Sequence, residues 1–148
     1  MLGAVANVHI HKTPVFGRFC ETWPAVYPGF PMSNSVKNIL IVDDETDTRL
    51  ALRLALSARG CAVQEARSPG EALDAVRAGS LDLVLIDLNM RDCDGIYLCR
   101  WIRAVSSVRI VTLFVSEAAK DDALLAGAND FIRKPFSIEE LLSRIQVQ

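Results

Sequence analysis

The sequence predicts an α/β fold, in which five parallel strands form one sheet and helices pack on both of its faces. Three observations support this prediction. Short apolar segments alternate with longer amphipathic segments over residues 36–148. One of them, residues 39–42, is an uninterrupted apolar run, which is typical of a strand buried on both faces. The order of strand, helix and strand favours parallel pairing through right-handed crossovers.

The first three elements lie within residues 39–66. Residues 39–42 form the apolar run ILIV, which predicts a strand. Apolar residues then recur at helical spacing over 47–59, and Gly60 supplies a stop for this helix. Residues 61–66 predict the second strand.

The next helix has a well-defined start. Ser68 is a suitable N-cap, Pro69 suits the first helical position, and Glu71 completes a capping box. Gly79 ends this helix, and residues 83–86 predict the third strand.

The remaining elements continue the alternation of helix and strand. In order, they are a helix over about residues 96–104, a strand over 108–115, a helix within 117–126 and a strand over 131–133, followed by a last helix from Ser137. Gly127 ends the fourth helix, and Ser137 with Glu140 forms a second capping box. Five strands therefore alternate with five helices.

Residues 1–35 do not share this pattern. Their prolines and glycines exclude long helices, and no periodicity persists beyond a few residues. We expect residues 1–35 to be a flexible or non-native extension, and residues 36–148 to be a single domain.

Composition excludes several classes of protein. The net charge of −2 gives no basic surface for nucleic acid. No apolar run approaches the roughly 20 residues that a membrane span requires. The four cysteines match no zinc or redox spacing. We therefore expect a cytoplasmic protein that neither crosses a membrane nor contacts nucleic acid directly. We interpret its cysteines as reduced thiols, and a disulfide is the alternative.

Three carboxylates follow the ends of two predicted strands. Asp43 and Asp44 follow the first strand, and Asp87 follows the third. In the flavodoxin-like strand order 2-1-3-4-5, these ends are neighbours at the switch point where doubly wound sheets bind ligands. Three carboxylates in one pocket raise one another's pKa unless a cation neutralises them. A few oxygen donors that leave room for water and phosphate favour Mg²⁺.

Three motifs occur at these positions in a characteristic order. They are VDDE after the first strand, DLNM followed by DG between Asp87 and Gly95, and GANDFIRKPF over residues 127–136. With these motifs, residues 36–148 resemble the receiver domain of two-component response regulators. The resemblance implies Mg²⁺-dependent transfer of a phosphoryl group from the phosphohistidine of a sensor kinase, followed by slow self-hydrolysis. Such a domain catalyses its own modification and is not a turnover enzyme.

The resemblance also implies a role for each matching residue. Asp87 would accept the phosphoryl group, and Lys134 would contact it. Asp44 would bind Mg²⁺ directly, Asp43 would bind it through water, and Asn89 would bind it through its backbone carbonyl. Asp87 would complete this metal site.

Other features implied by the resemblance concern the response to phosphorylation. Phe131 matches an aromatic residue whose rotamer follows phosphorylation, and Lys134-Pro135 is a candidate cis peptide. The modification would shift a surface of the fourth helix, fifth strand and fifth helix, which is also a candidate homodimer face. The implied partners are a sensor histidine kinase or phosphotransfer protein, and a downstream effector protein or a removed output domain.

One departure from the family pattern lies in the loop after Asp87. The family usually has Met-Pro in this loop, and here Arg91 follows Met90. Arg91 is either a solvated loop residue, which we favour, or a residue that alters phosphodonor access or the lifetime of the phosphoryl group.

A second departure concerns the switch hydroxyl of the family. Either Thr112 or Ser116 matches it. The alignment is ambiguous because the segment from Asp87 to Gly127 is a few residues shorter than is usual in the family. We favour Ser116, which follows a full strand over residues 108–115 and implies a fourth helix about one turn shorter. Thr112 is then part of the strand.

Two other functions fit parts of the pattern. A degenerate receiver would bind proteins without phosphorylation, and its supporting features are Arg91 and the short fourth helix. A small Mg²⁺-dependent phosphohydrolase fits less well, because Asn89 replaces the second aspartate of the D-x-D motif of haloacid dehalogenase-like phosphatases. Trp101, taken alone, is expected to be a core residue of its helix.

Overall fold

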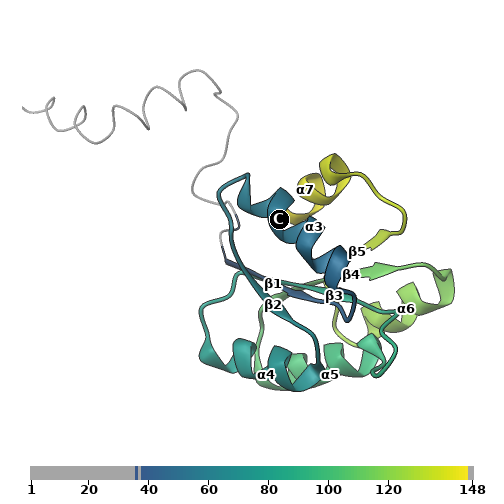
Figure 1. The fold of residues 1–148 in the computed structure, drawn as a ribbon. Helices are drawn as coiled ribbons and strands as arrows, with labels where there is room; N and C mark the ends of the chain where they lie inside the picture. The colour runs from purple at the N-terminus through teal and green to yellow at the C-terminus, as the bar shows by residue number, and fades with distance from the viewer. Residues whose placement is uncertain (1–35, 37, 147–148) are drawn as a thin grey trace, which may run out of the picture. The chain divides into compact units, whose positions relative to one another are not determined.

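The computed structural model describes residues 36 and 38–146. Within this part of the chain, five strands form one parallel sheet in the predicted order β2-β1-β3-β4-β5 (Figure 1). The strands are β1 (Asn38–Val42), β2 (Ala62–Ala66), β3 (Leu83–Asp87), β4 (Arg109–Phe114) and β5 (Asp130–Arg133). The helices are α3 (Thr46–Ser57), α4 (Pro69–Ala78), α5 (Gly95–Val105), α6 (Glu117–Leu125) and α7 (Ile138–Gln146). The predicted α/β fold is confirmed.

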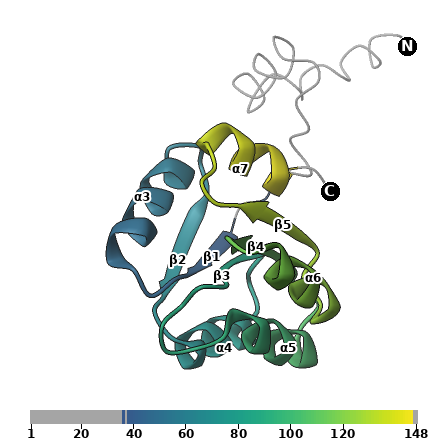
Figure 2. The same ribbon diagram turned by 90° about the vertical axis from the view of Figure 1, so that its right-hand side faces the viewer.

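Helices cover both faces of the sheet. Helices α3 and α7 lie on one face, and α4, α5 and α6 lie on the other (Figures 1 and 2). Successive side chains of a strand point to opposite faces, so each strand supplies both cores. In β1, Ile39 and Ile41 join the core next to α3 and α7, whereas Leu40 and Val42 join the core next to the other three helices. An uninterrupted apolar run is therefore the expected sequence for this strand.

The helix boundaries follow the predicted start and stop residues closely. Ser68 Oγ accepts the backbone N–H of Glu71 at 3.2 Å, and Gly79 adopts a φ of 80° after α4. Helix α3 spans Thr46–Ser57, so it begins one residue earlier and ends two residues earlier than predicted. It ends early because the backbone N–H groups just before Cys61 form i→i−3 hydrogen bonds in a tighter turn.

One arginine connects the ends of two helices on the three-helix face. The Arg103 guanidinium donates to the backbone oxygens of Ser106 and Val108 at 3.0 and 2.7 Å. It also donates to Gly127 O at 2.8 Å and to Asn129 Oδ1 at 2.9 Å. These acceptors follow α5 and α6, whose final carbonyl groups have no partner within the helix. Arg103 therefore fixes the end of the short helix α6 against α5.

Trp101 lies on the exposed side of α5 and not in the core. Trp101 is 47% exposed, and its ring stacks on Tyr97 with 6.4 Å between ring centroids. The prediction of a core position was wrong because Leu98 and Ile102 occupy the buried stripe of this helix.

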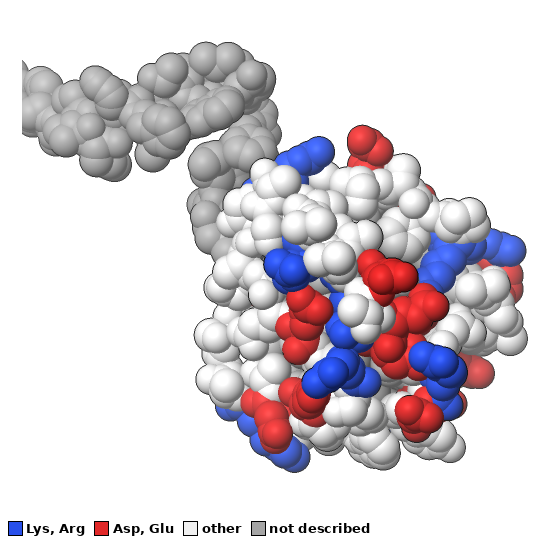
Figure 3. Space-filling view, in the orientation of Figure 1, with Lys and Arg blue, Asp and Glu red and all other residues white. Residues whose placement is uncertain are grey.

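Charge on the visible surface is mixed in sign. Acidic and basic side chains are interspersed on the face drawn in Figure 3. This distribution agrees with the small net charge of −2. Among the described helices, none combines the length and the apolar character that crossing a membrane would require.

Candidate functional site

Three carboxylates meet at the carboxyl ends of β1 and β3. These strands are parallel neighbours, with Val42 paired to Ile86, so the residues that follow the pair lie side by side. One oxygen each of Asp43, Asp44 and Asp87 lies within 4.8 Å of the others. It is the only such group of metal-ligating side chains among the described residues. The strand order brings these carboxylates together as the sequence predicted.

Asp43 carries a buried oxygen with no partner. The residue is 1% exposed, and its Oδ1 accepts the backbone N–H of Glu45 at 2.8 Å. Its Oδ2 is buried and has no hydrogen-bond partner among the described residues. Burial is the main influence that raises the pKa of Asp43, and the nearby charge of Asp87 adds to it, whereas the Glu45 N–H lowers it. Burying a carboxylate oxygen without a hydrogen-bond partner costs folding free energy, and a cation bound next to this oxygen would offset that cost.

Asp44 has a different environment from its neighbour. Its Oδ2 accepts the backbone N–H of Arg91 at 2.7 Å, and the Arg91 Nε lies 3.4 Å from the same oxygen. The backbone N–H of Arg91 is the main reason why the pKa of Asp44 is lowered. Asp44 is thus held in its charged form at the pocket mouth. Three carboxylates without histidine or cysteine suit a hard cation such as Mg²⁺ better than Zn²⁺.

Asp87 pairs with the lysine that the third motif supplies. Lys134 Nζ lies 3.0 Å from Asp87 Oδ1, and the backbone N–H of Asn89 donates to the same oxygen at 3.0 Å. The backbone N–H of Lys134 donates to Phe114 O at 2.8 Å, which holds the end of β5 beside β4. The Lys134-Pro135 peptide is cis, as expected. The pocket therefore combines a buried carboxylate, an ammonium group and two further carboxylates.

The start of α5 packs tightly against the backbone of the same strand end. A Cβ atom added at Gly95 would lie 2.8 Å from both Asp87 O and Leu88 Cα. Asp94 Oδ1 caps the helix by accepting the Ile96 backbone N–H at 2.8 Å. The DG pair of the second motif thus combines a helix cap with a residue that must lack a side chain. Sequence reasoning used this pair only as a motif and did not identify its packing role.

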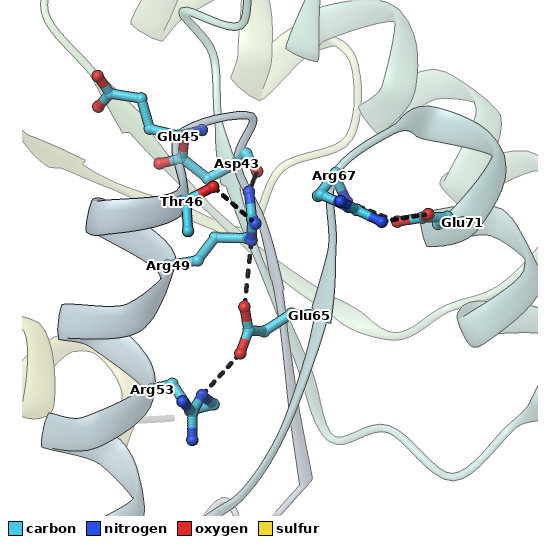
Figure 4. A network of polar contacts seen from close by, with 8 residues as sticks. All are labelled: Asp43, Glu45, Thr46, Arg49, Arg53, Glu65, Arg67 and Glu71. Carbon is cyan, nitrogen blue, oxygen red and sulfur yellow. Dashed lines mark hydrogen bonds and ion pairs between the residues drawn. The ribbon is translucent and has the colours of Figure 1, made fainter.

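A buried arginine supports the turn that carries Asp43. Arg49 on α3 is 5% exposed, and its Nη1 donates to Asp43 O at 2.8 Å (Figure 4). Its Nε lies 3.1 Å from Glu65 Oε1 on β2, and Arg53 Nε lies 2.7 Å from the other Glu65 oxygen. Sequence reasoning missed Arg49. The available signal was its position three residues before Leu52, on the buried stripe of α3.

The two candidate hydroxyl groups occupy different places. Thr112 is fully buried inside β4, paired with Ile86 and Phe131, and its Oγ1 donates to Asp130 O at 3.5 Å. Ser116 is exposed at the start of α6, and its side chain accepts no capping hydrogen bond from that helix. Thr112 is part of the strand, as expected, whereas the role of Ser116 stays a prediction.

Two cations from different helices contact the ring of Phe131. Its ring contacts Phe114 edge-on with 5.8 Å between centroids. Lys120 Nζ of α6 lies 4.8 Å from the ring centroid, and the guanidinium carbon of Arg144 on α7 lies 5.6 Å from it. The ring is half-buried, so a change of its rotamer would affect contacts with both helices.

Known proteins share the sequence pattern of this chain. The model of the response regulator receiver domain family matches residues 39–146. Response regulator MprA of Mycolicibacterium vanbaalenii is 37% identical over 111 residues, which cover 73% of this chain and 48% of that protein. MprA of Mycobacterium bovis is 36% identical with the same coverage. This chain spans about half the length of the curated relatives it matches.

Solved structures share the fold as well. The response regulator TrrA of Thermotoga maritima, solved in complex with Mg²⁺-BeF, has 30% identity and a TM-score of 0.67, covering 74% of this chain and 96% of that one. A response regulator of Burkholderia pseudomallei, solved with a phosphorylated aspartic acid, a calcium ion and citrate, has 29% identity and a TM-score of 0.70. That similarity covers 75% of this chain and 67% of that one.

Proposed function

This chain belongs to the response regulator receiver domain family, and on this premise we propose that it accepts a phosphoryl group on Asp87 in an Mg²⁺-dependent reaction. The observation that carries the proposal is the contact of Lys134 Nζ with Asp87 Oδ1 at 3.0 Å, beside the carboxylates of Asp43 and Asp44. A carboxylate, an ammonium group and an acidic metal pocket are the groups that phosphoryl transfer to an aspartate requires.

The proposed metal ligands are those implied by the sequence. Asp44 and Asp87 would bind Mg²⁺ directly, Asn89 would bind it through its backbone carbonyl, and Asp43 would bind it through water. The unpartnered Oδ2 of Asp43 supports this assignment, because a hydrated cation would supply the missing partner. When bound, Mg²⁺ supplies positive charge that offsets the negative charge of the transferring phosphoryl group.

The phosphoryl transfer is a displacement at phosphorus. A carboxylate oxygen of Asp87 forms the new bond to phosphorus, while the bond from phosphorus to the histidine nitrogen of the donor breaks. The imidazole leaves with the electron pair and takes up a proton. Lys134 stabilises the negative oxygens of the transferring group, and Asn89 orients Asp87 through its backbone N–H.

We propose that phosphorylation changes the conformation of the surface formed by α6, β5 and α7. Ser116 at the start of α6 contacts the phosphoryl group, and Phe131 changes its packing between Lys120 and Arg144. The shift of this surface alters contacts with a downstream effector or with a second copy of the chain. Each contact biases an existing equilibrium between two arrangements.

The proposed donor is a sensor histidine kinase or phosphotransfer protein, and the proposed location is the cytoplasm. Cys93 and Cys99, in the described part of the chain, are free thiols. Free thiols agree with a reducing compartment. No direct contact with nucleic acid is proposed for this chain.

Acetyl phosphate tests the proposed chemistry directly. The protein is incubated with acetyl phosphate, with and without Mg²⁺, and its intact mass is compared with that of Asp87→Asn. A single phosphoryl adduct that needs both Mg²⁺ and Asp87 is expected, with release of acetate. A folded protein that forms no adduct in excess Mg²⁺ would contradict the proposal and favour the binding module that acts without phosphorylation.

A further inference from the structure

The loop after Asp87 contacts the metal pocket through a residue that departs from the family pattern. Where the family usually carries proline, Arg91 donates its backbone N–H to Asp44 Oδ2 at 2.7 Å. Its Nε lies 3.4 Å from the same oxygen. A proline has neither a backbone N–H nor a cationic side chain, so it could make neither contact.

The charges around Asp44 make this contact relevant to metal binding. Three carboxylates face the pocket, and Lys134 is paired with Asp87. The guanidinium of Arg91 is therefore the positive group next to Asp44. A divalent cation bound to Asp44 would be repelled by this guanidinium at short range, whichever carboxylate oxygen it uses.

The Arg91 side chain is free to leave when a cation enters. It is 78% exposed, and among the described residues its guanidinium contacts Asp44 alone. Its departure disturbs no core packing. The backbone N–H of Arg91, in contrast, is part of the loop and can continue to orient the Asp44 carboxylate after the side chain has moved.

We propose that Arg91 is a built-in counter-cation that competes with Mg²⁺ for Asp44 and so weakens the Mg²⁺ affinity of this receiver. The inference rests on the proposed function, because it assumes that the three carboxylates hold Mg²⁺. The exposed Arg91 side chain agrees with the expected solvated loop residue, and the proposal adds an influence on the metal site.

NMR titration with MgCl₂ tests this competition without relying on phosphorylation. The dissociation constant for Mg²⁺ is measured from the chemical shifts of the backbone amides, including that of residue 91. The measurement is made for the wild type, Arg91→Ala, Arg91→Gln and Arg91→Lys. We expect Arg91→Ala and Arg91→Gln to bind Mg²⁺ about two- to fivefold more tightly, as for the loss of one exposed ion pair. Arg91→Lys keeps the charge and should behave like wild type.

A matched control removes a charge elsewhere. Arg67 is also exposed, and its ion pair is with Glu71 at 4.0 Å rather than with the pocket. Arg67→Ala should change the Mg²⁺ affinity less than Arg91→Ala does, and the difference should shrink at high salt. Equal effects of Arg91→Ala and Arg67→Ala would overturn the inference while leaving the metal site intact. If the wild type binds no Mg²⁺, or if Asp44→Asn binds it equally well, the proposed metal site itself fails.

Discussion

Lys134 Nζ and Asp87 Oδ1 are 3.0 Å apart, although 47 positions separate the two residues in the sequence. The pair forms because β3 and β5 both flank β4, and each residue lies at the carboxyl end of its strand or directly after it. Asp87 is buried, whereas Lys134 is partly exposed. The lysine thus neutralises a buried carboxylate and remains accessible to an incoming group.

Replacing Lys134 should affect chemistry more than folding. We expect Lys134→Ala to lower the rate of adduct formation with acetyl phosphate by at least about tenfold, because one preorganised donor for the phosphoryl oxygens is lost. Intact mass spectrometry over time measures this rate. Arg133→Ala is the control, because Arg133 pairs with Glu117 at 2.7 Å and not with Asp87. Equal rates for the two variants would contradict the role of Lys134.

Asp43 should destabilise the metal-free protein. Its carboxylate has an unpartnered buried oxygen, so we expect Asp43→Asn to raise the free energy of unfolding in EDTA by about 1 kcal/mol. Urea unfolding in EDTA and in Mg²⁺ measures this change. Mg²⁺ should stabilise the wild type more than the variant, and the opposite order would contradict a metal role for Asp43.

The raised pKa of Asp43 also predicts a pH dependence. Between its ordinary pKa of 3.8 and the higher folded-state value, the folded protein binds the proton more tightly than the unfolded chain does. The contribution of Asp43 to the unfolding free energy therefore falls as the pH rises through this window. In EDTA, the unfolding free energy of the wild type minus that of Asp43→Asn should fall with pH in the same way. If this difference does not change with pH, the pKa of Asp43 does not contribute to the pH dependence of stability.

Gly95 should tolerate no side chain. We expect Gly95→Ala to lower the free energy of unfolding by about 1–3 kcal/mol, because its Cβ would lie 2.8 Å from the Asp87 carbonyl oxygen. Gly70→Ala is the matched control, since a Cβ there meets no atom within 4 Å and alanine favours the helix. Urea denaturation of both variants decides the matter. Two equally stable proteins would show that the strand end can move away from α5.

Arg49 should stabilise the turn that carries Asp43. We expect Arg49→Met to cost about 1–3 kcal/mol of unfolding free energy, because it removes the hydrogen bond to Asp43 O and one partner of Glu65. Arg53→Met removes the more exposed partner of the same glutamate and should cost less than about 1 kcal/mol. Chemical denaturation measures both values, and a larger loss for Arg53→Met would refute this ranking.

The fold and the meeting of the carboxylates were predictable because they depend on local patterns. The run ILIV of β1 and the caps at Ser68 and Ser137 each specify an element from a few neighbouring residues. Once the strand order is assumed, Asp43 and Asp87 must be neighbours, because Val42 pairs with Ile86. No long-range information beyond topology was needed.

The contacts that sequence reasoning missed are made by long side chains, which extend to residues that are distant in the sequence. Arg49 lies 16 positions before Glu65, and Arg103 bonds to Gly127 across the gap between two helices. Long cationic side chains have many conformers, and composition does not select among them. The contact of Arg91 with Asp44 is of the same kind, since it spans 47 positions.

The close approach at Gly95 has a practical consequence for varying this protein. The segment between Asp87 and Gly95 is anchored at both ends, while Asn89, Arg91 and Asp92 inside it are exposed. Substitutions at these exposed positions can therefore be screened as a library without repacking either core. Because Arg91 contacts Asp44, such a library would vary the charge at the mouth of the carboxylate pocket while the end of β3 and the start of α5 stay in place.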